Sequence, residues 1–271
     1  MQNNTQIKTP SSSDVKREKK RRRRIPPAIV ALIVIFVLVA MVVAAYFILR
    51  IRTVEFSGSE VYSHEQLMSA SGIVFGEKMY GINKGSIEDN IIKGCPYVKQ
   101  AVITRGLPST LKIAIEEYLP VFYIEVSGEY FVFGENMRVL ERLTSKEDAE
   151  SRGLIKLAIS GASHAIVGQY LVINDGKDDN FIKKVMRGVM DSQIYERINI
   201  VDIRNKYDIF VVCDGLYKML LGDSSDITVK LNLGGKILED SMFDNNQNKA
   251  QIDLTNTTEP SVIVDNQIVF E

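Results

Sequence analysis

The stretch PYVKQAVITRGLPSTLKIAIEEYLPV, residues 96–121, decides how the first folded part of the chain is built. Its second half alternates apolar and polar side chains, which places Leu111, Ile113 and Ile115 on one face of a strand. The turn signal GLPS separates this run from an earlier strand-like run, VKQAVITR. The two runs therefore predict a β-hairpin with one face on a hydrophobic core.

The residues before the hairpin predict one strand and two helices. Residues 51–56 alternate apolar and polar side chains, as a half-buried strand does. Ser63 and Gln66 fit a capping box at the start of a first helix, and Ser86 is the N-cap candidate of a second helix. The order strand, helix, helix, strand, strand gives a small domain of the α+β class over residues 50–120.

Residues 121–254 predict a second domain that is rich in strands and contains two helices. Short apolar runs, separated by Gly, Asn and Asp turns, are typical of a meander. The first helix is indicated by four apolar residues at helical spacing, namely Ile182, Val185, Met186 and Val189. The second is predicted over residues 227–243, with an interruption at Gly234 and Gly235. Residues 255–271 are expected to form a C-terminal strand and tail.

The segment before these domains has the composition of a membrane anchor. Residues 25–49 carry no charge. A helix of the 22 residues from position 28 onward is about 33 Å long, enough to cross a bilayer core of about 30 Å. A cleaved signal peptide is the alternative, but its apolar region is usually shorter, about 7–15 residues. We therefore predict one uncleaved transmembrane helix over residues 25–49.

Charge sets the expected orientation of this anchor. Residues 1–24, predicted as a disordered tail, hold nine basic and two acidic residues, whereas the rest of the chain holds 24 basic and 32 acidic residues. The positive-inside rule places the basic tail in the cytoplasm and the body outside. The basic run could also bind nucleic acid or anionic lipid, but topology and lipid contact explain it more simply, so no nucleic-acid partner is predicted.

Several strings of this sequence carry a resemblance to a known family. VEFSGSEVYS, from residue 54, and CPYVKQAVITRGLPSTLKIAIEEYLPVFYI, from residue 95, resemble the POTRA domain of the FtsQ/DivIB bacterial cell-division proteins, with its β-α-α-β-β order. LGDSSDITVKLNLGGKIL, from residue 221, and the later QIDL resemble the β-domain of the same family. The family frequently continues this last motif with a basic and an aromatic residue, where this chain has Thr255 and Asn256.

The resemblance implies a non-catalytic scaffold of the bacterial divisome. Such a protein is a single-pass type II protein of the cell membrane, enriched at the division septum. Its outer domains bind FtsL-like and FtsB/DivIC-like bitopic division proteins and help to recruit and regulate the septal peptidoglycan synthase complex. The POTRA domain would take part in recruitment. The late strand region, residues 252–264, would pair with a strand of a partner protein. The expected partner-binding residues are Ile252, Leu254, Asn256 and Thr258.

Enzymatic alternatives find little support in the sequence. A sortase-like transpeptidase would pair Cys213 with His164 and need a later arginine, but no arginine follows Arg204. An S-x-x-K match begins at Ser109 without the K-T-G motif that such enzymes need. The scattered His and Cys residues predict no zinc site, and the Asp-rich loop from residue 175 lacks EF-hand spacing. We therefore expect no catalytic residue, no cofactor and no metal.

Two further alternatives remain open at this stage. Cys95 and Cys213 could form a disulfide outside the membrane, but their place in separate predicted domains favours two buried free thiols. A POTRA-type chaperone or transport module is the other functional class, although the pattern of an outer-membrane barrel is missing.

Overall fold

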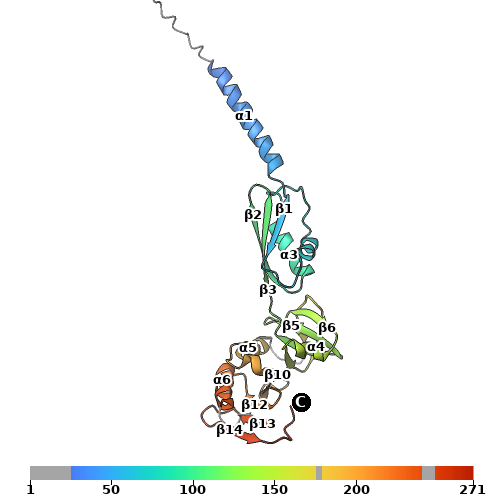
Figure 1. Ribbon diagram of the computed structural model, residues 1–271, viewed down its shortest axis with the longest axis vertical. Helices are drawn as coiled ribbons and strands as arrows, with labels where there is room; N and C mark the ends of the chain where they lie inside the picture. The colour runs from blue at the N-terminus through green and yellow to red at the C-terminus, as the bar shows by residue number, and fades with distance from the viewer. Residues whose placement is uncertain (1–25, 175–178, 240–247, 271) are drawn as a thin grey trace, which may run out of the picture. The chain divides into compact units, whose positions relative to one another are not determined.

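The computed structural model describes residues 26–174, 179–239 and 248–270, and it divides into two units, residues 1–48 and residues 49–271. The described part of the first unit is helix α1, Pro27–Ile48, which contains no charged residue (Figure 1). It is the one helix within the described ranges that is long and apolar enough to cross a membrane, with a mean hydropathy of 3.3 over an 18-residue window. The candidate anchor predicted from the sequence is thus a single continuous helix.

The second unit begins with a three-stranded sheet and two helices (Figure 1). The sheet order is β1-β3-β2, with β1 parallel and β2 antiparallel to β3, so the predicted order of elements and the predicted hairpin are confirmed. The five elements are β1 (Thr53–Ser57), α2 (His64–Ser71), α3 (Lys84–Gly94), β2 (Val98–Gly106) and β3 (Thr110–Glu117). Leu111, Ile113 and Ile115 all lie in the core of this domain, as their alternation predicts.

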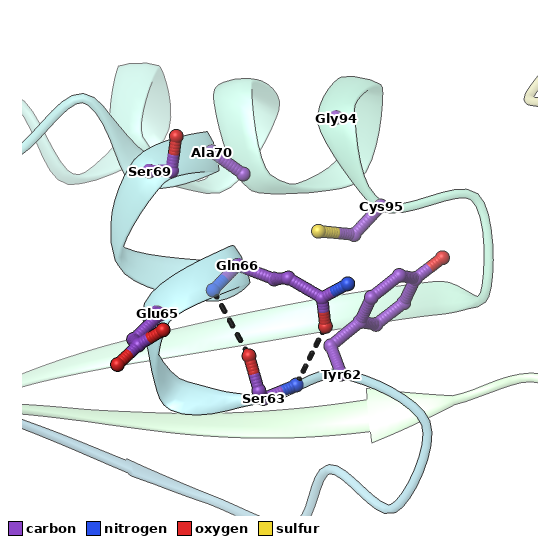
Figure 2. Close-up of a pocket in the computed structure, with 8 residues that line it drawn as sticks. All are labelled: Tyr62, Ser63, Glu65, Gln66, Ser69, Ala70, Gly94 and Cys95. Carbon is purple, nitrogen blue, oxygen red and sulfur yellow. Dashed lines mark hydrogen bonds between the residues drawn. The ribbon is translucent and has the colours of Figure 1, made fainter.

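Side-chain caps set where the two helices of this domain begin. The backbone N–H of Gln66 donates to Ser63 Oγ at 3.3 Å, and the N–H of Ser63 donates to Gln66 Oε1 at 2.8 Å, which confirms the capping box (Figure 2). The prediction of Ser86 as the second cap was wrong. Asn83 caps α3, because its Oδ1 accepts the N–H of Ser86 at 3.3 Å and the helix has already begun at Lys84.

The strand-rich part is built on one mixed nine-stranded sheet of order β14-β13-β12-β11-β10-β7-β4-β5-β6. Its first five strands along the chain are β4 (Phe122–Val126), β5 (Glu129–Phe133), β6 (Val139–Leu143), β7 (Ile155–Ala158) and β10 (Ile198–Asp202). The remaining four are β11 (Ile209–Cys213), β12 (Tyr217–Gly222), β13 (Ala250–Asp253) and β14 (Ser261–Val264). A separate two-stranded sheet holds β8 (Ala162–His164) and β9 (Val172–Ile173).

Two long helices pack together and share one hydrophobic cluster with this sheet. They are α5 (Asp179–Met190) and α6 (Ile227–Leu238). The four α5 residues that the spacing predicts as buried have no exposed surface. Two shorter elements, α4 (Lys146–Ser151) and the 3-10 turn η1 (Tyr195–Arg197), were not predicted. The coarse prediction of a mixed chain with an apolar helix, a small α+β domain and a strand-rich part is confirmed.

Helix α6 runs through Gly234 and Gly235 without a break, so the predicted interruption was wrong. A Cβ atom at Gly235 would lie 2.5 Å from Ile194 Cγ2, and one at Gly234 would lie 2.6 Å from Met219 Sδ. The two glycines therefore serve close packing of the helix on its neighbours, which outweighs their low helix propensity. The predicted end of this helix, residues 240–243, lies outside the described residues.

Candidate partner-binding edge

The four residues predicted to bind a partner fall into two environments. Ile252 and Leu254 are fully buried and belong to the large core cluster, so their side chains cannot meet a partner in the folded protein. Asn256 and Thr258 are exposed, in the loop between β13 and β14. The structure thus brings the first pair into the core and leaves only the second pair at the surface.

Strand β13 is not an edge strand. It pairs in parallel with β12 on one side, and in antiparallel fashion with β14 on the other side. Its alternate residues are buried because their side chains pack in the core cluster that the sheet shares with α5 and α6. Within the described residues, β14 is the outermost strand at this end of the sheet.

The backbone of β14 offers hydrogen-bonding groups at this edge. The N–H of Asp265 donates to Lys249 O at 3.0 Å, in line with the register of the β13–β14 pair. Residues of an antiparallel strand point their N–H and C=O groups alternately toward and away from the neighbour. Counting back from Asp265, the groups of Val262 and Val264 point away from β13. Such a row is a template for another strand.

The side chains of β14 make this edge apolar. Ile263 is 57% exposed and Val264 is 44% exposed, and Val262 packs partly against the core cluster. The strand itself, residues 261–264, carries no charged side chain that would discourage pairing. An exposed apolar edge of this kind is suited to an added strand with apolar side chains.

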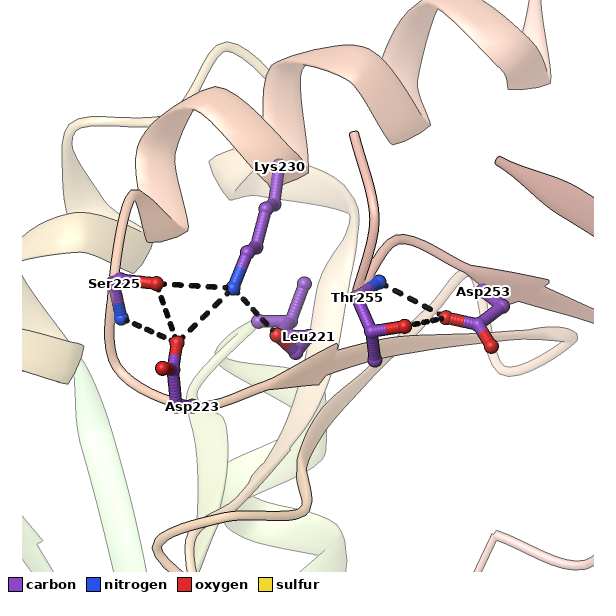
Figure 3. Close-up of polar contacts among 6 residues, drawn as sticks. All are labelled: Leu221, Asp223, Ser225, Lys230, Asp253 and Thr255. Atoms are coloured by element: carbon purple, nitrogen blue, oxygen red, sulfur yellow. Dashed lines mark hydrogen bonds and ion pairs between the residues drawn. The ribbon is translucent and has the colours of Figure 1, made fainter. Parts of the chain in front are cut away.

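The loop before β14 is shaped by its own side chains. The N–H and Oγ1 of Thr258 both donate to Asn256 Oδ1, at 3.1 Å and 2.7 Å. Asp253 accepts from the N–H and Oγ1 of Thr255 in the same way, at 2.9 Å and 2.6 Å (Figure 3). These turns fix the path from β13 to β14. Asn256 and Thr258 therefore position the edge strand through the loop.

A buried lysine holds the neighbouring loop in place. Lys230, on α6, is only 5% exposed, and its Nζ donates to Leu221 O at 2.7 Å and to Asp223 Oδ1 at 3.3 Å (Figure 3). Asp223 Oδ1 also accepts from the N–H and Oγ of Ser225, at 2.9 Å and 2.5 Å. The sequence reasoning missed this cluster. The signal for it is a single lysine inside the apolar run ITVKLNL.

The Asp223 cluster predicts a specific dependence of stability on pH. Hydrogen bonds from the hydroxyl and the N–H of Ser225, and then from Lys230, lower the pKa of Asp223 from 3.8 to about 2. A carboxylate whose pKa falls on folding stabilises the native state at every pH above the pKa that it has in the unfolded chain. This contribution is lost as the pH falls toward 2. We expect Asp223→Asn to unfold at a lower temperature than the parent at pH 6, with the gap closing near pH 2. Thermal melts of both proteins across this range measure it, and a constant gap would contradict the assignment.

The two cysteines are buried free thiols, as predicted. Burial raises the pKa of Cys213 to about 12, so its sulfur stays a protonated thiol at neutral pH. The sulfur lies 3.9 Å from Met219 Sδ inside the core, and His164 is exposed on β8. This arrangement gives no support to a nucleophilic Cys213. The described parts of the chain contain no group of three or more His, Cys, Asp or Glu residues that could hold a metal.

The amino-acid sequence of this chain is similar to those of several known proteins. Residues 49–118 match the family model described as the FtsQ-type POTRA domain. The cell division protein DivIB of Clostridium botulinum is 26% identical over 192 residues, which cover 70% of this chain and 72% of that protein. The cell division protein FtsQ of Corynebacterium glutamicum is 24% identical over 180 residues, covering 66% and 74%. DivIB of Bacillus subtilis is 31% identical over a shorter stretch of 103 residues, covering 38% and 39%.

Proposed function

We propose, from the similarity of this chain to the DivIB and FtsQ cell division proteins, that it is a membrane-anchored, non-catalytic scaffold of the divisome. The apolar helix α1 is the anchor. The basic tail lies in the cytoplasm and the two outer domains lie on the far side of the membrane, at the septum. The outer domains bind FtsL-like and FtsB/DivIC-like bitopic proteins and help to recruit and regulate the septal peptidoglycan synthase complex.

The open edge of β14 is the observation that carries the binding mechanism. Backbone groups of Val262 and Val264 point away from β13, and the edge is apolar. A partner segment in extended conformation pairs with this edge and continues the sheet by one strand. Main-chain hydrogen bonds supply the affinity. This mechanism needs no catalytic side chain, which agrees with the buried thiols of the chain.

A proline pair at the edge tests this mechanism. Val262→Pro combined with Val264→Pro removes both outward N–H groups and leaves the inward N–H of Ile263 in place. We expect at least about tenfold weaker binding of the coexpressed bitopic partner, since each net hydrogen bond contributes about 1 kcal/mol. Quantitative co-purification of the full-length proteins measures the change.

The matched control for this experiment keeps the backbone intact. Val262→Thr combined with Val264→Thr preserves both N–H groups and the β-branched shape, and it should bind the partner like the parent. Circular dichroism must give the same spectrum for both variants, so that a loss of fold is recognised. A folded proline variant that binds like the parent would refute pairing at β14. A fluorescent fusion that does not gather at the septum would refute the division role itself.

A further inference from the structure

One end of the POTRA domain is built around the residues that directly follow α1. The N–H of Met79 donates to Leu49 O at 3.1 Å, the N–H of Ile51 donates to Glu77 O at 2.9 Å, and the N–H of Gly76 donates to Ile51 O at 2.9 Å. These bonds fasten the loop between α2 and α3, residues 73–82, to the segment of residues 49–51.

The β2–β3 turn is fastened to the same end. The N–H groups of Arg52 and Thr53 donate to Ser109 O at 2.9 Å and 3.3 Å. The α2–α3 loop and the β2–β3 turn are therefore both tied to residues 49–53. The two loops therefore stay next to residues 49–53 wherever this segment lies.

The two loops carry large apolar side chains that the core does not use. Four of them are between 56% and 66% exposed, namely Val74, Phe75, Tyr80 and Leu107. Together with the basic residues described next, we call them the Phe75 patch. The four are two aromatic and two aliphatic side chains on loops that are tied to the same segment. Tyrosine, the residue at position 80, is enriched at the boundary between membrane and water.

Basic residues surround these apolar side chains. The same three segments hold Arg50, Arg52 and Lys78 against one acidic residue, Glu77, and with Arg105 at the end of β2 the net charge is +3. The guanidinium of Arg105 lies over the ring of Tyr80 at 5.3 Å, and its Nε donates to Met79 O at 2.9 Å. From residue 25 onward, the chain as a whole carries a net charge of −8. This end is therefore positively charged, whereas the chain from residue 25 onward is acidic as a whole.

Chain connectivity alone fixes how far this end lies from the membrane. Residue 51 is three residues beyond the last residue of α1, Ile48, so their Cα atoms are at most about 11 Å apart in any orientation. A helix of 22 residues is about 33 Å long, so a spanning α1 ends near the boundary of the hydrocarbon core. The polar layer of each leaflet adds about 5–8 Å. With a spanning α1, residues 49–51 therefore lie within about 11 Å of the edge of the hydrocarbon core, close to the layer of lipid headgroups.

We propose that the Phe75 patch docks onto the membrane surface at the point where α1 emerges, with its apolar side chains among the headgroups and its basic residues on anionic lipid. The proposal rests on the membrane anchoring given above. Apolar burial and attraction to anionic lipid act together in such a contact. The contact fixes which end of the POTRA domain faces the lipid.

The depth of residue 75 in the bilayer tests this proposal. Both native cysteines are buried, so a cysteine introduced by Phe75→Cys in the full chain takes up a polarity-sensitive dye selectively. In vesicles of phosphatidylcholine and phosphatidylglycerol, we expect blue-shifted emission that headgroup-level spin-labelled lipids quench. A dye at Tyr207→Cys, in the β10–β11 loop of the other domain, is the control and should stay in water. Flotation of the chain with the vesicles reports the anchor independently.

A charge reversal in the same labelled chain tests the role of the basic residues in docking. Lys78→Glu combined with Arg52→Glu, in the Phe75→Cys background, should lower the quenching at least twofold. Lys93→Glu, an exposed change in the last turn of α3, should leave it unchanged. A chain that floats while its residue 75 dye behaves like the residue 207 dye would overturn the patch alone, as would quenching that arises only when a bitopic partner is added. A chain that does not float would overturn the anchor and the patch together.

Discussion

Replacing Ile113 with aspartate is expected to unfold the POTRA domain, at a cost of about 4 kcal/mol in the free energy of unfolding. Ile113 is 1% exposed at the centre of β3 and packs in the core of that domain. An unpaired carboxylate has no partner there, and it must either stay charged in an apolar environment or take up a proton. Few single substitutions reach this size.

The neighbouring residue provides a matched control. Ala114 lies on the opposite face of β3 and is exposed, so Ala114→Asp adds the same charge to the same strand without burying it. Thermal melts of the full chain by circular dichroism compare the two, since the protein has no tryptophan for fluorescence. Proteolytic cuts within residues 50–120 should increase for Ile113→Asp only. Equal melting of both variants would mean that the face of β3 is wrongly assigned.

A proline at Leu254 is expected to disrupt the strand-rich domain, with a loss of about 3 kcal/mol or more. The N–H of Leu254 donates to Leu220 O at 2.9 Å, and its side chain is fully buried. Proline removes this donor from the interior of the sheet and also empties part of the core. A loss of partner binding in this variant would therefore report a damaged fold and would carry no information about an edge.

A second proline position separates these two effects. Val262→Pro removes an N–H that points away from β13, so we expect its cost in stability to be much smaller than that of Leu254→Pro. Urea unfolding of the two single variants, followed by circular dichroism, compares them directly. If both variants unfold at the same urea concentration as the parent, the hydrogen-bonding direction assigned to β13 and β14 is wrong.

Local signals in the sequence predicted those elements that depend on local chemistry. The alternation that places Leu111, Ile113 and Ile115 on one face follows from the geometry of a single strand, and the core contains all three. The capping box of Ser63 and Gln66 involves residues three positions apart, so no distant contact decides it. Confirmed features of this kind need only a short window of sequence.

Tertiary packing decided the features that the sequence did not predict. Gly234 and Gly235 look like a helix break, but they are small because Met219 and Ile194 approach them closely. Such close packing leaves no periodic trace in the sequence. The cap of α3 is a different case, because the side chain of Asn83 reaches the amide of Ser86 only three positions on, and both residue types are good caps, so the local sequence offered two candidates.

The candidate site was predicted only in part, because its position depends on the order of strands in the sheet. The late strand region was recognised, but alternation cannot say how many further strands lie beyond β13. Ile252 and Leu254 belong to the core because their side chains pack in the cluster that the sheet shares with α5 and α6, and β14 pairs with β13, so the exposed backbone lies at Val262 and Val264. Strand order is a property of the whole sheet, so it becomes visible only in the structure.

The two thiols bear on how this protein matures. Cys95 lies in the core cluster of the POTRA domain and Cys213 in that of the strand-rich domain, so no covalent bridge ties either core together. Neither domain is held by a disulfide in its native state. We therefore expect folding to proceed without an oxidant or a disulfide isomerase, and the melting temperature to be indifferent to added reductant.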